Sequence, residues 1–329
     1  MKDNSHIDFV YSGSIEGAID SILRGDKQGV TLVNSIAVSQ IASLPTGPLG
    51  GTHCCGFTSV LSVVTKIMRK IIEWFSGFRT NQQVVVQRQR IDLGDRRPGC
   101  PIYAIGDVHG RLDLLKSAEA RIADDISATG KDGLTVLLGD FIDRGPSSAQ
   151  VINHLMRESE LGLKRLSLAG NHEEVFLRYL NNPEKHASWL GLGGEQTLAS
   201  YGIDVHSVAF RQSRLKGTLR ALLDEAVPES HRRFLADLPV SLKVGNFLLV
   251  HAGVRPGVSL GDQSDQDMIW IREPFLSEGP KIPQLFVIHG HTPHDTPNPG
   301  PQRMGIDTGA FYTGRLTVLR VDGNQSRFV

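Results

Sequence analysis

The sequence predicts an α/β fold that carries its functional groups at the carboxyl ends of buried strands. From Pro101 onward, short runs rich in leucine and β-branched residues each end in a polar cluster. Segments with apolar residues at helical spacing lie between these runs. Alternation of strand, polar loop and helix is typical of α/β proteins, in which ligands bind beyond the carboxyl ends of the strands.

The composition excludes several classes of protein. The chain has 329 residues, of which 40% are hydrophobic, enough for one large domain or two small ones. Its 35 basic and 35 acidic side chains balance, whereas proteins that hold nucleic acid by charge need an excess of Lys and Arg. No run approaches the ~18 apolar residues of a membrane span, and the start lacks the apolar core of a secretory signal. We therefore expect a soluble, cytoplasmic protein with no nucleic-acid partner and no transmembrane segment.

Residues 1–97 lack the alternating apolar runs and polar clusters of the rest of the chain, and they are predicted to form an N-terminal extension that is partly disordered. Apolar side chains between Val60 and Phe78 recur at helical spacing, with basic side chains on the other face. We expect a basic amphipathic helix near residues 58–78. Such a helix suits peripheral contact with an anionic membrane, and docking on its own protein is the alternative.

Residues 98–329 are predicted to form one catalytic domain. The five runs predicted as strands are PIYAI before GDVHG, LTVLL before GDFIDRG, LKRLSL before AGNHE, FLLV before HAG, and LFVI before HGHT. Short apolar runs of this kind are typical of buried strands. Helical patterns occupy Leu112–Ser127 and Ser147–Arg157, and the longer segment Glu173–Pro239 is mostly helical.

The polar loops supply side chains that can bind metal ions. Three oxygen donors and three imidazoles follow the strands: Asp107, His109, Asp140, Asn171, His251 and His291. Such a mixed set suits Mn²⁺, Fe²⁺ or Zn²⁺ better than Ca²⁺, which prefers oxygen ligands alone. Six donors suffice for two ions only if one carboxylate bridges them. Any single loop could equally be a turn with a capping aspartate, but five such loops in order favour a metal centre.

In motif, order and spacing, the chain resembles the phosphoprotein phosphatase-type, calcineurin-like metallophosphoesterases. The motifs that carry the resemblance are GDVHG (106–110), GDFIDRG (139–145), GNHE (170–173), HAG (251–253) and GHT (290–292). The resemblance covers about residues 98–329. It implies a central β-sandwich flanked by helices, with a centre of two divalent metal ions. Mn²⁺ is the first expectation for these ions, and Fe²⁺ and Zn²⁺ are the alternatives.

The resemblance also implies a role for each loop residue. Of the metal ligands, one ion would take Asp107, His109 and His291, and the other Asn171 and His251, with Asp140 bridging the two. A hydroxide that bridges the metals would attack phosphorus directly, without a covalent enzyme intermediate. His172 would protonate the leaving oxygen as general acid, and Asp143 would hold its other ring nitrogen.

Arginines are the expected phosphate ligands because the planar guanidinium donates two parallel hydrogen bonds. Arg144 in GDFIDRG and Arg272 in WIREPF match positions at which the family contacts phosphate. Arg255, after HAG, is a third candidate, with a surface arginine as the alternative. His289 is either an additional ligand or, as we expect, a residue outside the ligand set. Asp307 is assigned to packing or hydrogen bonding near the site.

Four further stretches of the sequence indicate the class of substrate. WLGLGGEQTLASYG (189–202), WIREPF (270–275), VIHGHTP (287–293) and IDTGAFYTGRLT (306–317) resemble the bacterial serine/threonine protein phosphatase-like subgroup. We therefore expect a phosphomonoesterase acting on a phosphoprotein or a phosphorylated small molecule, first of all a serine/threonine phosphoprotein phosphatase. The alternative is a symmetrical diadenosine tetraphosphatase. A catalytically inactive interaction module is disfavoured, since no expected ligand is missing. The segment MRKIIEWFSGFR resembles the N-terminus of such proteins, so that Met68 is a candidate for the true start.

Overall fold

The computed structural model describes residues 87–95, 98–323 and 325–329. The amphipathic helix expected near residues 58–78 and the candidate start at Met68 lie outside the described residues. Among the helices that the structure describes, none is long and apolar enough to span a membrane.

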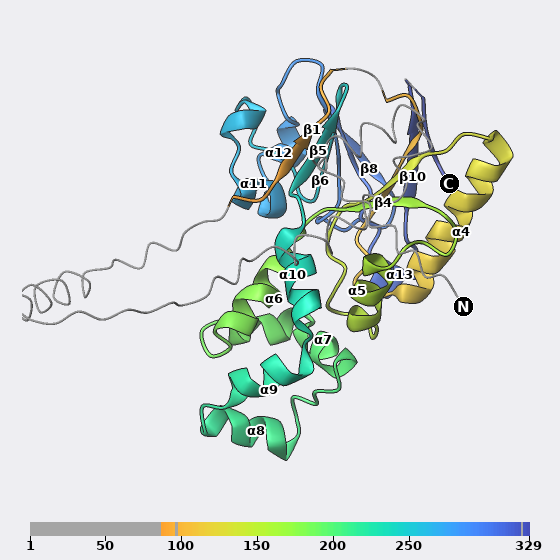
Figure 1. Cartoon of the computed structure of the whole chain (residues 1–329). Coiled ribbons are helices and arrows are strands. Elements are labelled where there is room, and N and C mark those ends of the chain that lie inside the picture. The colour runs from red at the N-terminus through yellow and green to blue at the C-terminus, as the bar shows by residue number, and fades with distance from the viewer. Residues whose placement is uncertain (1–86, 96–97, 324) are drawn as a thin grey trace, which may run out of the picture. The chain divides into compact units, whose positions relative to one another are not determined.

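Two β-sheets pack face to face at the centre of the fold (Figure 1). The first sheet has the order β1-β5-β6-β7-β9-β8, with β1 (Arg90–Asp92), β5 (Ser241–Val244), β6 (Phe247–Val250), β7 (Phe286–His289), β8 (Asn298–Gly300) and β9 (Arg303–Gly305). The second has the order β11-β10-β2-β3-β4, with β2 (Ile102–Ile105), β3 (Leu134–Leu137), β4 (Lys164–Ser167), β10 (Val318–Asp322) and β11 (Gln325–Phe328). The predicted β-sandwich is confirmed, and all five predicted runs form strands.

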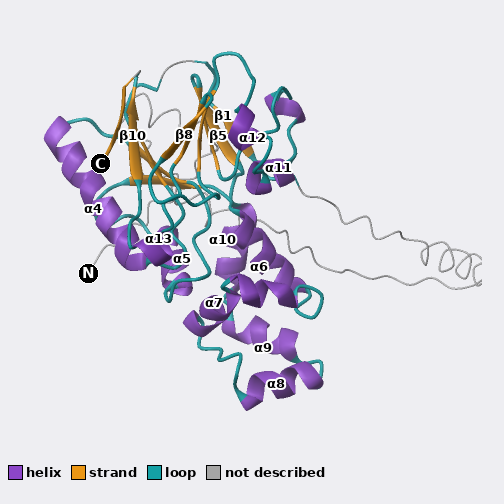
Figure 2. Ribbon diagram, turned by 180° about the vertical axis from the view of Figure 1, so that it is seen from behind, coloured by secondary structure: helices purple, strands orange, loops and turns teal. Residues whose placement is uncertain are grey.

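Helices flank the sandwich on both sides, as Figure 2 shows from behind. On the side of the second sheet lie α4 (Leu112–Thr129) and α5 (Ser148–Met156), and on the side of the first sheet lie α11 (Asp265–Trp270), α12 (Phe275–Glu278) and the short 3₁₀ helix η3 (Leu260–Asp262). The remaining short helix, α13 (Ala310–Thr313), precedes β10. The helical patterns predicted over Leu112–Ser127 and Ser147–Arg157 are therefore confirmed.

A helical lobe lies between β4 and β5 in the chain and below the sheets in Figure 1. It comprises α6 (Asn171–Asn181), the 3₁₀ helix η2 (Ala187–Leu192), α7 (Gly194–Ser200), α8 (Val208–Leu215), α9 (Leu219–Ala226) and α10 (Glu229–Asp237). The lobe begins and ends at adjacent points, because the backbone N–H of Ala169 donates to the carbonyl of Pro239 at 2.8 Å. The prediction of a mostly helical segment over Glu173–Pro239 is confirmed.

The strand register places the motif loops at one edge. In the second sheet, β2 runs parallel to β3 and β3 parallel to β4, with Ile105 opposite Leu137 and Leu137 opposite Ser167. In the first sheet, β6 runs parallel to β7, with Leu249 opposite Ile288. Since the strand ends are aligned, the loops that follow them leave each sheet at the same level.

Apolar side chains from both sheets fill the space between them. Ile102 and Ala104 point into this inner core with Leu242 and Ile288 of the facing sheet. Tyr103, whose place in β2 lies between those two residues, instead packs against the helices. The alternation follows from the pleat of a strand, and it explains why β2 is fully buried on both faces.

The predicted domain boundary at residue 98 is wrong. Strand β1 pairs in parallel with β5, and Ile91 is buried in the core between the sheets. The folded domain therefore includes Arg90–Asp92, which the sequence analysis had placed in the extension. A three-residue edge strand of sequence RID carries one buried side chain, so it gives no hydrophobic pattern long enough to predict.

A buried ion pair ties α4 to β4. Glu119 accepts hydrogen bonds from Arg165 at 2.8 Å and from His154 at 2.7 Å. Arg165 also donates to the carbonyls of His154 and Arg157. The side chains of Glu119 and Arg165 are 3% and 2% exposed, so neither charge has water as an alternative partner.

We predict that Arg165→Met lowers the free energy of unfolding by about 3–5 kcal/mol, because it leaves the Glu119 carboxylate buried without its cation. Urea unfolding followed by circular dichroism measures the change. Arg233→Met is the control: it breaks an exposed pair with Glu229 and should cost less than about 0.5 kcal/mol. Equal effects of the two variants would contradict the prediction.

Candidate metal centre and active site

The loops at the strand ends turn sharply, and several of their residues have a strained backbone conformation. Positive φ angles of 44°, 50°, 70°, 69° and 65° occur at His109, Asp140, Asp143, Arg144 and His291. Non-glycine residues rarely adopt this conformation, which costs about 1–3 kcal/mol each and persists where the surrounding structure enforces it. All five are residues that the sequence analysis assigned to the site, so the strain directs side chains toward one place.

Asp140 is buried at the point where these loops meet. Its Oδ2 is 3.7 Å from Nε2 of His109 and 3.8 Å from Nε2 of His172. Its Oδ1 is 3.4 Å from Nε2 of His251. Two groups of potential metal-binding atoms share Asp140, one with His109 and His172 and the other with His251 and His291.

His291 belongs to the side of the site that contains Asn171. The Oδ1 atom of Asn171 is 2.9 Å from Nε2 of His251 and 2.9 Å from Nδ1 of His291. The backbone N–H of His291, by contrast, donates to both carboxylate oxygens of Asp107 at 3.2 and 3.1 Å. The structure thus contradicts the grouping of the His291 side chain with Asp107 and His109.

Second hydrogen bonds orient the histidine rings. The Nδ1–H of His109 donates to the carbonyl of Ile142 at 2.8 Å, and that of His251 donates to the carbonyl of Leu138 at 2.8 Å. The Nε2 lone pair of each ring is then directed toward Asp140. Burial lowers the pKa of His109 to about 3, which keeps the ring in the neutral form that ligates metal ions.

Buried carboxylates complete the donor set. Burial, and then the charges of Asp307 and Asp140, raise the pKa of Asp107 well above its ordinary value. Burial also raises the pKa of Asp307 to about 6. Like charges held together away from water are unfavourable unless a cation is shared between them. Nε2 of His291 is in addition buried without a hydrogen-bond partner among the described residues. The residues present therefore fit divalent metal ions.

His172 has a different environment from the other histidines. Its Nδ1 is 2.6 Å from Oδ2 of Asp143. Burial alone would lower the pKa of His172, but the charge of Asp140 and the contact with Asp143 raise it above its ordinary value. Neighbouring histidines with pKa values displaced in opposite directions are suited to different roles.

Asp143 is fixed by two lobe residues that sequence reasoning missed. Trp189 donates its indole N–H to Oδ2 of Asp143 at 2.8 Å, and Thr197 donates its hydroxyl to Oδ1 at 2.6 Å. Both side chains are fully buried. They lie in the run WLGLGGEQT, which indicated the subgroup but not the contact, since nothing local connects it to GDFIDRG.

Glu173 is a further residue without a predicted role. Its carboxylate accepts backbone N–H bonds from Asp140, Phe141 and Gly170 at 2.8–3.0 Å, and so joins the GDFIDRG loop to the GNHE loop. Burial and the charge of Asp140 raise the pKa of Glu173 to about 7. The signal was present in the sequence, because a glutamate in the first turn of a helix commonly caps backbone N–H groups.

Of the three predicted arginines, Arg144 contacts histidines of the site. Nη1 of Arg144 is 2.9 Å from Nε2 of His109, and Nη2 is 3.1 Å from Nε2 of His172. Arg272 is exposed, and after burial its charge is among the causes that lower the pKa of His251 and His291.

The structure places Arg255 at the surface, which was the alternative that the sequence left open for this residue. Its guanidinium forms a two-pronged ion pair with Asp267, with distances of 2.9 and 3.2 Å. The side chain is 60% exposed and turned to α11, so its charge is already paired.

His289 is buried and lies outside both groups of potential ligands. Its Nδ1–H donates to the carbonyl of Gly290 at 3.0 Å, and its ring packs edge-on against Phe275. Asp307 lies beside Asp107 and accepts the backbone N–H of Gly309 at 2.9 Å. Both residues therefore support the loops rather than extend the ligand set.

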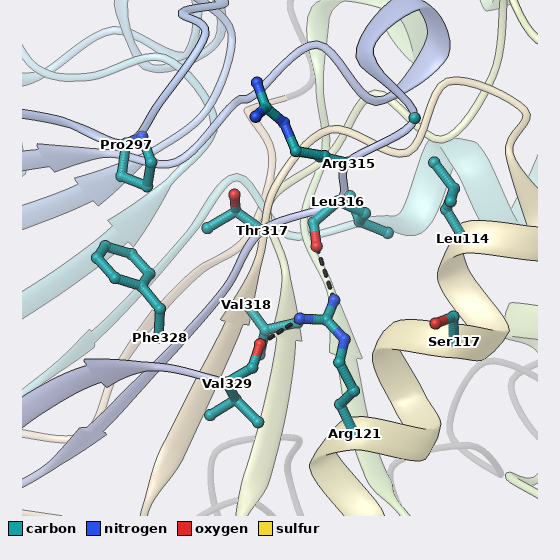
Figure 3. Close-up of a pocket in the computed structure, with 11 residues that line it drawn as sticks. Leu114, Ser117, Arg121, Pro297, Arg315, Leu316, Thr317, Val318, Phe328 and Val329 are labelled. Carbon is teal, nitrogen blue, oxygen red and sulfur yellow. Dashed lines mark hydrogen bonds between the residues drawn. The ribbon is translucent and has the colours of Figure 1, made fainter.

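A cavity of about 600 Å³ lies elsewhere, between α4, β10 and the loop that follows α13 (Figure 3). Arg121 crosses it and donates to the carbonyls of Leu316 and Val329. None of the predicted site residues lines this cavity. The chemistry of the motif loops is therefore separate from it.

Several known proteins are similar to this chain in sequence. The sequence model of the calcineurin-like phosphoesterase family matches residues 100–310. The chain is 33% identical to serine/threonine-protein phosphatase 2 of Escherichia coli (strain K12), over 67% of this chain and 92% of that protein. It is 27% identical to the asymmetrical bis(5'-nucleosyl)-tetraphosphatase PrpE of Bacillus velezensis, over 66% of this chain and 87% of that protein.

A solved structure described as a putative diadenosine tetraphosphatase is similar to this chain with a TM-score of 0.49 and 19% identity. The similarity covers 74% of this chain and 97% of the other. From the family match over residues 100–310 and from relatives that are named as phosphatases, it follows that the chain belongs to the calcineurin-like phosphoesterase family and is a metal-dependent hydrolase of phosphoric ester bonds.

Proposed function

We propose that the chain is a phosphomonoesterase with two divalent metal ions, acting in the cytoplasm on phosphoserine and phosphothreonine proteins. The observation that carries the proposal is the contact between His172 and Asp143 beside Asp140, because it supplies a proton donor next to a metal-binding group. The relative of E. coli supports the protein substrate by its name.

Hydrolysis of dinucleotide polyphosphates is the second candidate. Several relatives at 23–28% identity are named as asymmetrical tetraphosphatases, whereas the alternative expected from the sequence is the symmetrical class. The same loops can serve both reactions, because the phosphomonoester and the phosphoanhydride bond each require a phosphoryl group to be bound and attacked by water, and the leaving oxygen to be stabilised, for example by a proton.

The donor atoms divide into two sets around Asp140. We assign them to the two ions as Asp107 and His109 for one, and Asn171, His251 and His291 for the other, with Asp140 between both. When bound, such ions attract a phosphate ester and lower the pKa of water, so that a nucleophile exists at neutral pH. The mixed oxygen and nitrogen donors favour Mn²⁺, with Fe²⁺ or Zn²⁺ as alternatives.

His172 is assigned as the general acid. The carboxylate of Asp143 accepts a hydrogen bond from the Nδ1–H of His172. The Nε2 atom of His172 is then directed toward Asp140 and Arg144. A proton on Nε2 would pass to the leaving oxygen of the ester. Because Trp189 and Thr197 fix Asp143, the ring is held in one orientation before substrate arrives.

Arg144 and Arg272 are assigned to the phosphate group. Arg144 has both terminal nitrogens within 3.1 Å of ring nitrogens, so a phosphate in front of His109 and His172 would lie within its reach. Its guanidinium also stacks on Phe311, with Cζ 4.9 Å from the ring centroid. The exposed Arg272 adds positive charge on the side of His251 and His291.

His172→Asn should lower kcat by about 10²–10⁴-fold and leave the metal content nearly unchanged, because the variant removes the proton donor and no assigned ligand. Steady-state hydrolysis of p-nitrophenyl phosphate and elemental analysis of the same sample test this. His231→Asn, a buried histidine of α10 bonded to Tyr201, is the control and should retain activity. Loss of metal in step with activity would refute the assignment of His172.

Asp140→Asn should remove both metal ions, since one carboxylate serves both sets of donors. Elemental analysis after gel filtration gives the number of ions per chain. Asp125→Asn changes a buried carboxylate of α4 that accepts from Tyr103 and belongs to neither group of potential metal-binding residues, and it should keep both ions. Full occupancy in Asp140→Asn would exclude the bridging role.

The substrate class is decided by turnover in Mn²⁺ of a phosphoserine peptide against diadenosine tetraphosphate. We expect faster release of phosphate from the peptide. If the dinucleotide is preferred, its products separate the classes, because asymmetrical cleavage gives ATP and AMP and symmetrical cleavage gives ADP. No product from either compound, with metal bound, would contradict both candidate functions and favour an interaction module.

A further inference from the structure

We propose that Arg88 and Arg90 are positioning residues for the active site, which act through Asp265 at the start of α11. Both arginines precede residues 100–310, the part that the family model matches. The inference rests on the proposed function, because it concerns the phosphate contact assigned to Arg272.

The two arginines hold Asp265 from both sides of its carboxylate. The backbone N–H of Arg88 donates to Oδ2 at 2.6 Å, and Nη2 of Arg90 donates to Oδ1 at 2.9 Å. The Arg90 and Asp265 side chains are 19% and 15% exposed, so water competes little for this contact. Asp265 is the first residue of α11, and its position fixes the start of that helix.

Arg90 also closes the loop that connects the HAG motif to α11. Nη2 donates to the carbonyl of Gln263 at 2.6 Å, and Nη1 donates to that of Leu260 at 3.1 Å. The Gln263 amide in turn bonds both the N–H and the carbonyl of Arg255, which follows HAG. One guanidinium thus binds several points of the loop, which a lysine ammonium could not match in geometry.

Arg88 extends the contact to the helical lobe. Its Nη1 donates to the carbonyls of Leu235, Ala236 and Leu238, at the carboxyl end of α10, at 3.0–3.1 Å. A cation at this end of a helix interacts favourably with the helix dipole. Arg88 therefore connects the lobe to α11, and the segment 88–90 holds the two together.

Helix α11, whose start is held by Asp265, also contacts the loops of the active site. The carbonyl of Met268 accepts the N–H of Ala252 at 2.8 Å, directly after His251. At the end of the helix, Trp270 donates its indole N–H to Glu174 of α6 at 2.8 Å, and its ring lies edge-on to His291 at 6.3 Å. Arg272 follows two residues later. A shift at Asp265 would therefore move Arg272 relative to the metal ligands.

Arg90→Met should raise KM for p-nitrophenyl phosphate about tenfold, with kcat and metal content within about twofold, because a small misplacement of a binding group weakens substrate binding. In an Arg272→Ala background the same change should have an effect of less than about twofold, since the residue it positions is gone. Arg90→Lys should recover part of the loss.

Lys243→Met is the matched control, since the Lys243 ammonium pairs with Asp92 and Asp95 at the other end of β1 and not with Asp265. It should leave KM unchanged. An equal loss from Arg90→Met in both backgrounds, or loss of metal, would overturn the inference. If Arg90→Met does not fold, Asp265→Asn gives the same comparison. Full activity of Arg272→Ala would instead contradict the proposed phosphate contact, and the inference with it.

Discussion

The buried carboxylate of Asp140, surrounded by the imidazole nitrogens of His109, His172 and His251 at 3.4–3.8 Å, is the interaction on which the other features depend. Four loops must meet within a few ångströms to form it. The parallel register of the strands brings these loops to one level, and the left-handed backbone at Asp140 aims its side chain. Hydrogen bonds from the backbone N–H groups of Asp140 and Phe141 to the Glu173 carboxylate help to offset that strain.

Much of this arrangement could be predicted because its signals are local. Each site loop follows a buried strand, so a short apolar run and a polar motif are adjacent in the sequence. The metal-ligand types, the His172 and Asp143 pair and Arg144 follow from these motifs together with the family resemblance. The structure brings all of them to one place, although their catalytic roles stay predictions.

The parts that could not be predicted depend on contacts distant in sequence. Whether the His291 side chain lies in the same ligand set as Asp107 or as Asn171 depends on the orientation of its ring. The spacing of residues in the sequence does not determine that orientation. Arg255 follows a motif, yet Asp267 on a later helix pairs with its charge. Strand β1 is too short for a hydrophobic pattern and is defined by pairing with β5, a segment about 150 residues away.

The helical lobe leaves and rejoins the sheet through the hydrogen bond between Ala169 and Pro239. The number of residues between α6 and Pro239 therefore does not set the distance between the GNHE and HAG motifs. Within the lobe, α6 itself carries Asn171 and His172, and Trp189 and Thr197 orient Asp143. A change in the length of the lobe beyond α6 would therefore leave His172 in its present orientation only if Trp189 and Thr197 kept their hydrogen bonds to Asp143.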